Sequence, residues 1–301
     1  MRHVTPMKGI RNMRTIMAKF TVTLLFLLTT MPTFAEVTFV SLLEEMTNLE
    51  RLSYFPSPAY TCKQFSSYDR RSTDKTILTD DNWFANSDRG QHIRVEERNG
   101  QQEWVMMDAD GPGTIVRIWS ANPDHAGIIR VYLDDAPDPI IEMPLIELLS
   151  GKTWPFLYPI AHWAASGWNS YLPIPYQKHC KVTASSPNFY YHINYRTYST
   201  DTVVETYSEQ VAQRAETQIR TVAERLSRPD TLELPPEKNA KQTTYSITLK
   251  PETQFLRSFT GPAAIYGIEM RVNGENLEKA LRACAIELRF DDARIAQVWT
   301  P

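Results

Sequence analysis

The sequence predicts a mainly β protein, a tandem or double jelly-roll with a connecting helix, in which the second roll is incomplete. Three observations lead to this prediction. Many short apolar segments alternate with tight-turn residues, one long segment has helical periodicity, and two similar segments begin at Gly111 and Gly261. The predicted organisation is a signal peptide at 1–35, an N-terminal helix and linker at 36–59, a first jelly-roll domain at 60–200, a connecting helix and linker at 201–243, and the truncated start of a second jelly-roll domain at 244–301.

The first domain shows the strand pattern most clearly. Turn sequences such as Asn99-Gly100 and Asp134-Asp135-Ala136-Pro137 separate its apolar segments, and no helical pattern lies between them. Many short strands without intervening helices are typical of a sandwich or jelly roll. The predicted strands include 115–119, 128–133, 181–183 and 190–195.

Two helices are predicted on either side of this domain. Residues 36–52 contain Ser41 and Glu44 in the spacing of a capping box. Residues 202–226 carry apolar side chains every three or four positions, which predicts a packed connector, with a coiled-coil partner helix as the alternative. Strands are expected to resume at 244–249.

An internal repeat supports the tandem architecture. Gly111-Pro112 and Asp134-Asp135 in the first copy correspond to Gly261-Pro262 and Asp291-Asp292 in the second. From the second aspartate to a closing proline, Pro144 or Pro301, is nine residues in both copies. The first copy is predicted to extend to about residue 200, so we expect the chain to break off inside its second copy, with unpaired strand edges.

The N-terminal segment predicts export. A basic head precedes the apolar run 22–28, and Thr33-Phe34-Ala35 offers small residues for cleavage. An uncleaved membrane anchor is the alternative, although the run is short for a bilayer. We expect a secreted or periplasmic protein, or one at the cell surface. Without residues 1–35, which carry five Lys/Arg and no acid, the net charge falls from −3 to −8, which disfavours nucleic acid and anionic membranes as partners.

The cysteines, Cys62, Cys180 and Cys284, match no metal or redox spacing. Three buried, unpaired thiols is the preferred interpretation, and a Cys62–Cys180 disulfide is the alternative that export permits.

A dense polar cluster between residues 66 and 110 is the candidate site. Carboxylates accept hydrogen bonds from sugar hydroxyls, and an indole face covers the C–H face of a sugar ring. Paired carboxylates also provide the acid, base or nucleophile of glycosidic cleavage. The candidate substrate-binding residues are Asp69, Arg70, Trp83, Asn86, Asp88, Glu103 and Asp110.

Several of these residues have a structural alternative. Asp69 and Arg70 could form an ion pair that orients a loop. Residues 80–88 could be a solvated turn, and their spacing does not match a calcium-binding EF-hand. Trp83, Trp104 and Trp119 are also typical of a core.

Other reaction classes are disfavoured. The sequence has no G-x-S-x-G nucleophile motif and no H-x-x-x-H or H-E-x-x-H spacing among its histidines. We therefore expect no metal site and no cofactor.

Several motifs resemble those of the DUF2961 family, also classed as glycoside hydrolase family 172. The resemblance covers most of residues 41–301 and lies in Leu42-Leu43-Glu44-Glu45-Met46, Ser66-Ser67-Tyr68-Asp69-Arg70, Asp108-Ala109-Asp110-Gly111-Pro112-Gly113 and Tyr171-Leu172-Pro173-Ile174-Pro175-Tyr176. It implies a double jelly-roll subunit that assembles, when full length, as a homotrimer or a multiple of trimers.

The resemblance also implies retaining cleavage or transfer at fructofuranosyl or arabinofuranosyl linkages, with two glutamates as nucleophile and acid/base. Only Asp69, Arg70 and Asp110 are carried over as motif positions near the site. One catalytic glutamate of the family is expected in a Gly-Thr-Gly-x-Glu-Asp-Tyr segment, which this sequence does not contain, so the catalytic residues stay unknown. A non-catalytic carbohydrate-binding or surface-scaffolding protein is the alternative function, because jelly rolls host lectins as readily as enzymes.

Overall fold

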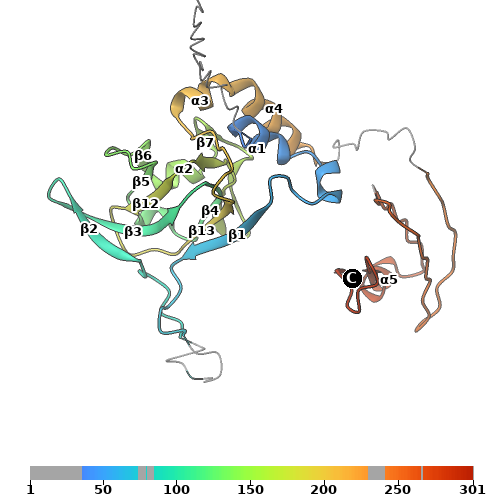
Figure 1. Ribbon diagram of the computed structural model, residues 1–301. Coiled ribbons are helices and arrows are strands. Elements are labelled where there is room, and N and C mark those ends of the chain that lie inside the picture. Colours follow the sequence, from blue (N-terminus) through green and yellow to red (C-terminus); the bar gives the residue numbers. More distant parts are fainter. Residues whose placement is uncertain (1–35, 74–78, 80–84, 230–240, 266, 301) are drawn as a thin grey trace, which may run out of the picture. The chain divides into compact units, whose positions relative to one another are not determined.

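The computed structural model describes residues 36–73, 79, 85–229, 241–265 and 267–300 of the chain. The predicted signal peptide and Trp83 lie outside these residues. Within them, residues 60–198 form two antiparallel sheets that pack face to face as a jelly-roll type sandwich (Figure 1). The mainly β fold class is therefore confirmed.

The first sheet has six strands in the described part of the chain, in the order β1-β13-β4-β10-β9, with β11 also pairing with β4. Its strands are β1 (Tyr60–Ser66), β4 (Gly113–Ser120), β9 (Ala161–Ala164), β10 (Gly167–Ser170), β11 (Ile174–Tyr176) and β13 (Tyr191–Tyr198).

The second sheet has five described strands in the order β2-β3-β12-β5-β6. They are β2 (Arg94–Arg98), β3 (Gln101–Asp110), β5 (Ile128–Leu133), β6 (Ile141–Pro144) and β12 (His179–Ala184). A short hairpin joins β7 (Lys152–Thr153) to β8 (Phe156–Leu157), and α2 (Leu145–Leu149) follows β6. The 3-10 turn η2 (Pro123–His125) lies between β4 and β5.

The core lies between the sheets and continues under the helices. Met107, Val131 and Val182 of the second sheet are buried with Ile115 and Ile193 of the first. Burial of each such side chain stabilises the fold by about 1.5–3 kcal/mol. The strands alternate inward apolar and outward polar residues, which is why their pattern could be recognised in the sequence.

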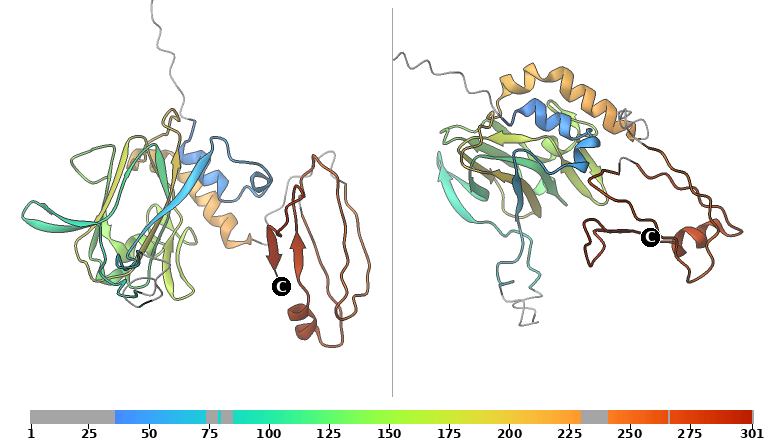
Figure 2. Two further views of the ribbon diagram at one scale, coloured as in Figure 1. Left: turned by 60° about the horizontal axis from the view of Figure 1, so that its bottom comes forward. Right: turned by 45° about the vertical axis from the view of Figure 1, so that its right-hand side comes forward.

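Helices cover one end of the sandwich, and the loop that follows β1 extends from the other end (Figures 1 and 2). The N-terminal helix α1 (Phe39–Glu45) is followed by the 3-10 turn η1 (Glu50–Ser53). It is shorter than predicted, and its capping box joins Thr38 to Ser41, not Ser41 to Glu44. Thr38 is the N-cap because its extended backbone lets its hydroxyl accept from the Ser41 N–H at 3.0 Å.

The predicted helix 202–226 is wrong in its first part. The helices here are α3 (Glu209–Arg214) and α4 (Glu216–Ser227), and Ser208 caps the first of them. Residues before Ser208 are extended because the backbone N–H of Glu205 donates to the carbonyl of Val37 at 2.8 Å, beside a bridge between Val37 and Val204. Tertiary pairing thus overrides a helical apolar spacing.

Residues 241–300 are described by themselves. They contain α5 (Leu277–Ala283) and a hairpin of β14 (Ile286–Leu288) and β15 (Val298–Thr300). No strand forms over 244–249, contrary to the prediction, and this segment is exposed on both sides without a hydrogen-bonded neighbour strand. Cross-strand pairing is what stabilises a strand.

The hairpin of the second copy repeats that of the first. In β5–β6, Ile129 pairs with Met143, and in β14–β15, Ile286 pairs with Thr300, so each position lies 157 residues later. Both aspartate pairs have positive φ, at 53° and 62° for Asp134-Asp135 and at 51° and 58° for Asp291-Asp292. Each pair forms the centre of a tight turn, closed by the N–H of Ala136 donating to the carbonyl of Leu133 at 3.0 Å and by the N–H of Ala293 donating to the carbonyl of Phe290 at 3.1 Å, and aspartate tolerates positive φ. The sequence repeat is therefore a structural repeat at this hairpin.

Candidate functional site

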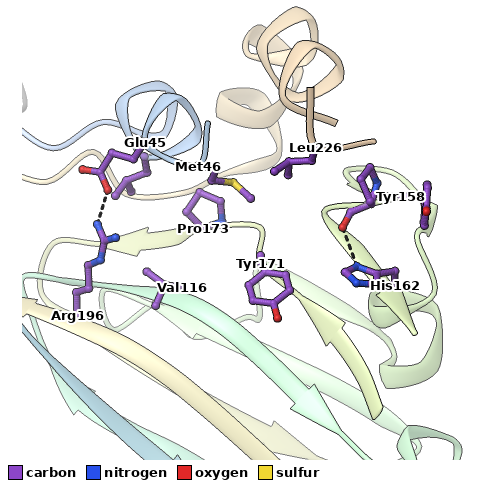
Figure 3. A pocket seen from close by; sticks show the side chains of 11 residues that line it. Glu45, Met46, Val116, Tyr158, His162, Tyr171, Pro173, Arg196 and Leu226 are labelled. Atoms are coloured by element: carbon purple, nitrogen blue, oxygen red, sulfur yellow. Dashed lines mark hydrogen bonds and ion pairs between the residues drawn. The ribbon is translucent and has the colours of Figure 1, made fainter. Parts of the chain in front are cut away.

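A pocket of about 560 Å³ lies between the outer face of the first sheet and the helices α1 and α4 (Figure 3). This volume is within the usual range for small-molecule sites. Val116, Tyr171 and Pro173 contribute from the sheet side, while Met46, the C-cap residue of α1, and Leu226 of α4 approach from above. The full lining is Leu42, Glu45, Met46, Val116, Tyr158, Pro159, His162, Tyr171, Pro173, Arg196 and Leu226.

The acidic residue of the pocket is held by two arginines. Glu45 accepts from Arg196 at 2.6 Å through one oxygen and from Arg51 at 3.0 Å through the other. Because both oxygens are engaged with cations, this carboxylate is suited to positioning and poorly suited to proton transfer. The guanidinium carbon of Arg196 also lies 4.2 Å from the centre of the Tyr60 ring.

The opposite wall carries aromatic rings. The Nδ1 of His162 lies 2.8 Å from the carbonyl of Pro159, and a carbonyl only accepts, so Nδ1–H is the donor. In the neutral ring, Nε2 is then an acceptor available to a hydroxyl. The rings of Tyr158 and Tyr171 lie 6.1 and 6.3 Å from that of His162, and Tyr158 is 65% exposed. Such a wall can pack against a sugar ring and bond its hydroxyls.

A polar network adjoins the pocket on the same sheet face. The Oδ1 of Asn169 accepts from Nε and NH2 of Arg117 at 3.1 and 3.0 Å, and weakly from the Tyr171 hydroxyl at 3.5 Å. Arg117 also donates to the Oδ1 of Asn194 at 3.4 Å, whose amide donates to Gln64 at 2.9 Å. Four strands thus place hydrogen-bonding groups side by side.

A pair of rings in contact, tilted by 33° to each other, follows this network along the sheet. The centroids of Trp119 and His192 are 4.7 Å apart. Burial, and then the positive charge of Arg117, holds the pKa of His192 below its ordinary value, while Asp88 acts in the opposite direction. A Cβ at Gly167 would lie 2.0 Å from the indole nitrogen of Trp119, so only glycine allows the indole to lie there.

The predicted polar cluster is not assembled in one place. Asp69, Arg70, Asn86 and Asp88 lie in the loop that follows β1, at the end of the sandwich away from the helices. Asp110 ends β3 near the other end, where β4 begins opposite Thr197. Ser66, at the end of β1, pairs with His192 of β13, and Thr197 lies five residues further along β13. The end of β1 and the start of β4 are therefore separated by roughly 17 Å.

The acidic residue Asp69 is engaged within its own loop. Its carboxylate pairs with Arg71 at 2.6 Å, not with Arg70, and accepts the backbone N–H of Ser87 at 2.8 Å. These bonds, chiefly that to Arg71, hold the pKa of Asp69 well below its usual range. Its own N–H donates to Asp88 at 2.8 Å. Asp69 is therefore part of an ion pair that orients its loop, as the structural alternative predicts, but its partner is Arg71 instead of Arg70.

Arg70 and Asn86 lie at the surface of the same loop. Arg70 donates to the carbonyl of Tyr68 at 2.7 Å and lies 4.6 Å from the centre of that ring, and Asn86 is exposed. Arg70 also hydrogen-bonds the side chain of the buried Tyr191, whereas Asn86 is open to solvent. Their role in binding stays a prediction.

Glu103 lies on the outer face of the second sheet. It is 3% exposed and accepts from the hydroxyls of Thr183 at 2.7 Å and Tyr132 at 3.0 Å, with Arg130 at 3.4 Å. Burial and this bond to Glu103 raise the pKa of Tyr132 to about 12. Glu103 therefore has structural partners on the sheet opposite the pocket.

The thiols are unpaired, but only Cys180 is buried. Cys62 and Cys284 are exposed, which corrects the expectation of three buried thiols. Among the described residues, no three His, Cys, Asp or Glu side chains are placed to hold a metal ion. No helix in this part of the chain is long and apolar enough to cross a membrane.

Comparison with known families decides the classification. The GH172 first beta-sandwich domain matches residues 58–215, just over half of the 301 residues. The chain belongs to glycoside hydrolase family 172. The resemblance seen in the sequence is confirmed, and the match begins just before β1 and ends between α3 and α4. No curated protein matches the chain.

The pocket residues of this GH172 chain were missed by sequence reasoning. Glu45, Tyr158, His162 and Arg196 come from four separate segments, which only the fold brings together. One signal was present for the adjoining network. Ile115 and Ile118 are three residues apart in a strand, which breaks the two-residue alternation and predicts a bulge. The pairing between β4 and β13 does shift there.

Proposed function

We propose that this chain belongs to an exported enzyme that cleaves or transfers fructofuranosyl or arabinofuranosyl groups. Family membership supports a glycoside hydrolase-type function. The observation that carries the proposal further is the pocket with its ring wall and the Arg117 network beside it. Rings that pack against C–H faces, next to side chains that bond hydroxyls, are what saccharide binding requires.

The described residues of the pocket supply binding and positioning. Glu45 is the carboxylate in its lining, and its two arginine bonds keep it from the role of acid or base. We therefore propose that the catalytic glutamates lie outside the described pocket lining, and that the first sandwich holds the saccharide.

The test is turnover of aryl arabinofuranosides and aryl fructofuranosides by the full-length protein. We expect release of the aryl group from a furanoside and not from the matching pyranosides, and no turnover by the present chain alone, which lacks the segment expected to carry a catalytic glutamate. Nuclear magnetic resonance of the first-formed product should show retention of the anomeric configuration. Exclusive turnover of pyranosides, or inversion, would contradict the proposal.

Binding without turnover is the second candidate function. The engaged state of Glu45 favours it, because a pocket with no free acid can hold a saccharide but not cleave it. A glycan array that shows furanoside binding, with no turnover of any aryl furanoside by the full-length gene product, would support this alternative.

Export and assembly are proposed on separate grounds. The basic and apolar segment 1–35 supports secretion or delivery to the periplasm. N-terminal sequencing of exported protein should show cleavage close to Ala35, and an intact N-terminus would contradict it.

Homotrimers or multiples of trimers are proposed for the full-length protein from the family resemblance, and mass measurement by light scattering tests this.

A further inference from the structure

The β-bulge in β4 determines where Arg117 points. Ile115 pairs with Tyr195 and Arg117 pairs with Asn194, so Val116 is an extra residue in this strand. Ile115 and Ile118 are buried in the core at 0% and 2% exposure, while Val116 and Arg117 both lie on the outer face. Strict alternation would turn Arg117 into the core, and bulges that re-aim a side chain are frequent beside functional sites.

The guanidinium of Arg117 is fixed but not saturated. It has five N–H groups, and three of them donate to Asn169 and Asn194. One N–H on each terminal nitrogen is therefore left without an acceptor in the described part of the chain. Two such N–H groups are what an arginine uses to bind a carboxylate through two parallel hydrogen bonds. Asn169 is 5% exposed, so the group that orients Arg117 is itself buried.

The charge of Arg117 has no carboxylate partner within 4.0 Å among the described residues. Other arginines on the outer sheet faces differ. Arg196 pairs with Glu45, and Arg130 pairs with Glu103 and Glu142. Neutral amide oxygens hold Arg117 in place without neutralising it, so its positive charge stays available to a ligand.

The surroundings of this charge suit a sugar. The Tyr171 ring, which lines the pocket, lies with its centre 6.0 Å from the guanidinium carbon. Trp119 follows Arg117 by two positions, and the centre of its indole lies 4.7 Å from that of the His192 ring. A ring that packs on these side chains would place a substituent within reach of Arg117.

We propose that Arg117 binds the carboxylate of an acidic sugar, a uronic acid unit within the saccharide that the pocket receives. This rests on the proposed function and specifies its substrate class: a glycan that carries a carboxylate next to the furanosyl linkage. Asn169 is a positioning residue, because it touches the guanidinium and not the ligand.

The test is calorimetric titration of the full chain with sodium glucuronate and with glucose, at low and at moderate salt. We expect glucuronate to bind about tenfold to hundredfold more tightly than glucose, the range of a charge-assisted hydrogen bond. Arg117→Gln should abolish this difference. Arg117→Lys keeps the positive charge but loses the two parallel N–H donors, so it should retain only part of the preference for glucuronate.

Controls separate binding from folding. Arg98→Gln removes a cation of the second sheet that pairs with the exposed Asp138, and it should leave the preference for glucuronate unchanged. If Arg117→Gln does not fold, the titration of His192 by nuclear magnetic resonance in the wild type replaces it. Glucuronate should raise the pKa of His192 toward its ordinary value, because the ligand offsets the charge of Arg117.

Equal binding of glucuronate and glucose, or a preference that survives in Arg117→Gln, would overturn the proposal. So would an unchanged pKa of His192 in saturating glucuronate. These results are read from binding and do not depend on turnover. Failure of the proposed function would appear instead as a lack of furanoside turnover by the full-length wild-type protein, so the two failures are distinguishable.

Discussion

The carboxylate of Asp69 accepts a hydrogen bond of 2.8 Å from the backbone N–H of Ser87, across 18 residues of the loop that follows β1. The same carboxylate binds Arg71, which also donates to the Ser87 hydroxyl at 3.0 Å. Asp69 is 1% exposed. Asp69 therefore holds its own loop together through Arg71 and Ser87.

Removing the charge of Asp69 should loosen this loop. Asp69→Asn keeps an acceptor for Ser87 but loses the ion pair with Arg71. We expect the Tm to fall by a few degrees and limited proteolysis to cut within 67–92 more rapidly. Asp138→Asn is the control, since that carboxylate is 85% exposed and its pair with Arg98 contributes little. Equal effects of the two substitutions would contradict this account.

The stability that Asp69 contributes should depend on pH. Its bonds, first of all that to Arg71, lower its pKa in the folded state below the ordinary value of 3.8. A lowered pKa means that the contribution is fully present above the unfolded-state value and is lost as the pH falls through the folded-state value. Urea unfolding should show a gap between wild type and Asp69→Asn that is constant from pH 7 to about pH 5 and narrows below about pH 4. A gap that widens on acidification would contradict the sign.

Glu103 should matter for stability. Glu103→Ala leaves Arg130 and the Tyr132 and Thr183 hydroxyls without their shared acceptor, and we expect a loss of about 3 kcal/mol in urea unfolding. The matched control is Glu97→Ala on the neighbouring strand β2, an exposed site where the change should stay within about 0.5 kcal/mol. If Glu103→Ala lost saccharide binding while its stability stayed unchanged, this account would be contradicted and Glu103 would be a substrate-binding residue.

Gly167 should be intolerant of any side chain. The Cβ of Gly167→Ala would lie 2.0 Å from the Trp119 indole nitrogen and would displace the ring from His192. We expect a shift in tryptophan fluorescence and weaker saccharide binding, by about tenfold. Gly267→Ala provides the control, since a Cβ there meets no atom within 4 Å. Identical spectra for both variants would show that Trp119 does not rest on this glycine.

Strand content and the matched hairpins were predictable because both depend on local pattern. Period-two apolarity specifies a strand, and paired aspartates before a fixed closing distance specify a turn. The strand β5 is followed by Asp134-Asp135, and the strand β14 is followed by Asp291-Asp292 in the same way. The segment 202–207 was assigned wrongly because its apolar spacing fits a helix, whereas its partner, Val37, lies far away in the sequence.

The site was less predictable for a related reason. Proximity in sequence suggested that Asp69, Glu103 and Asp110 would meet, but β3 alone separates the last two by seven residues, or roughly 24 Å of extended chain. Conversely, Arg117, Asn169 and Asn194 meet although no motif joins them, because β10, β4 and β13 are adjacent in the sheet. Such a group of residues can be predicted only when the order of the strands in the sheet is known.

The most direct test of the central claim, that saccharide binds on the outer face of the first sheet, compares two tyrosines of equal exposure. Tyr171 is 38% exposed and lines the pocket, whereas Tyr190 is 37% exposed and precedes β13 at the other end of the sandwich. Calorimetric titration with arabinofuranose and fructofuranose oligosaccharides should show about tenfold weaker binding for Tyr171→Ala and unchanged binding for Tyr190→Ala. Unchanged binding for Tyr171→Ala, or a loss confined to Tyr190→Ala, would contradict the claim.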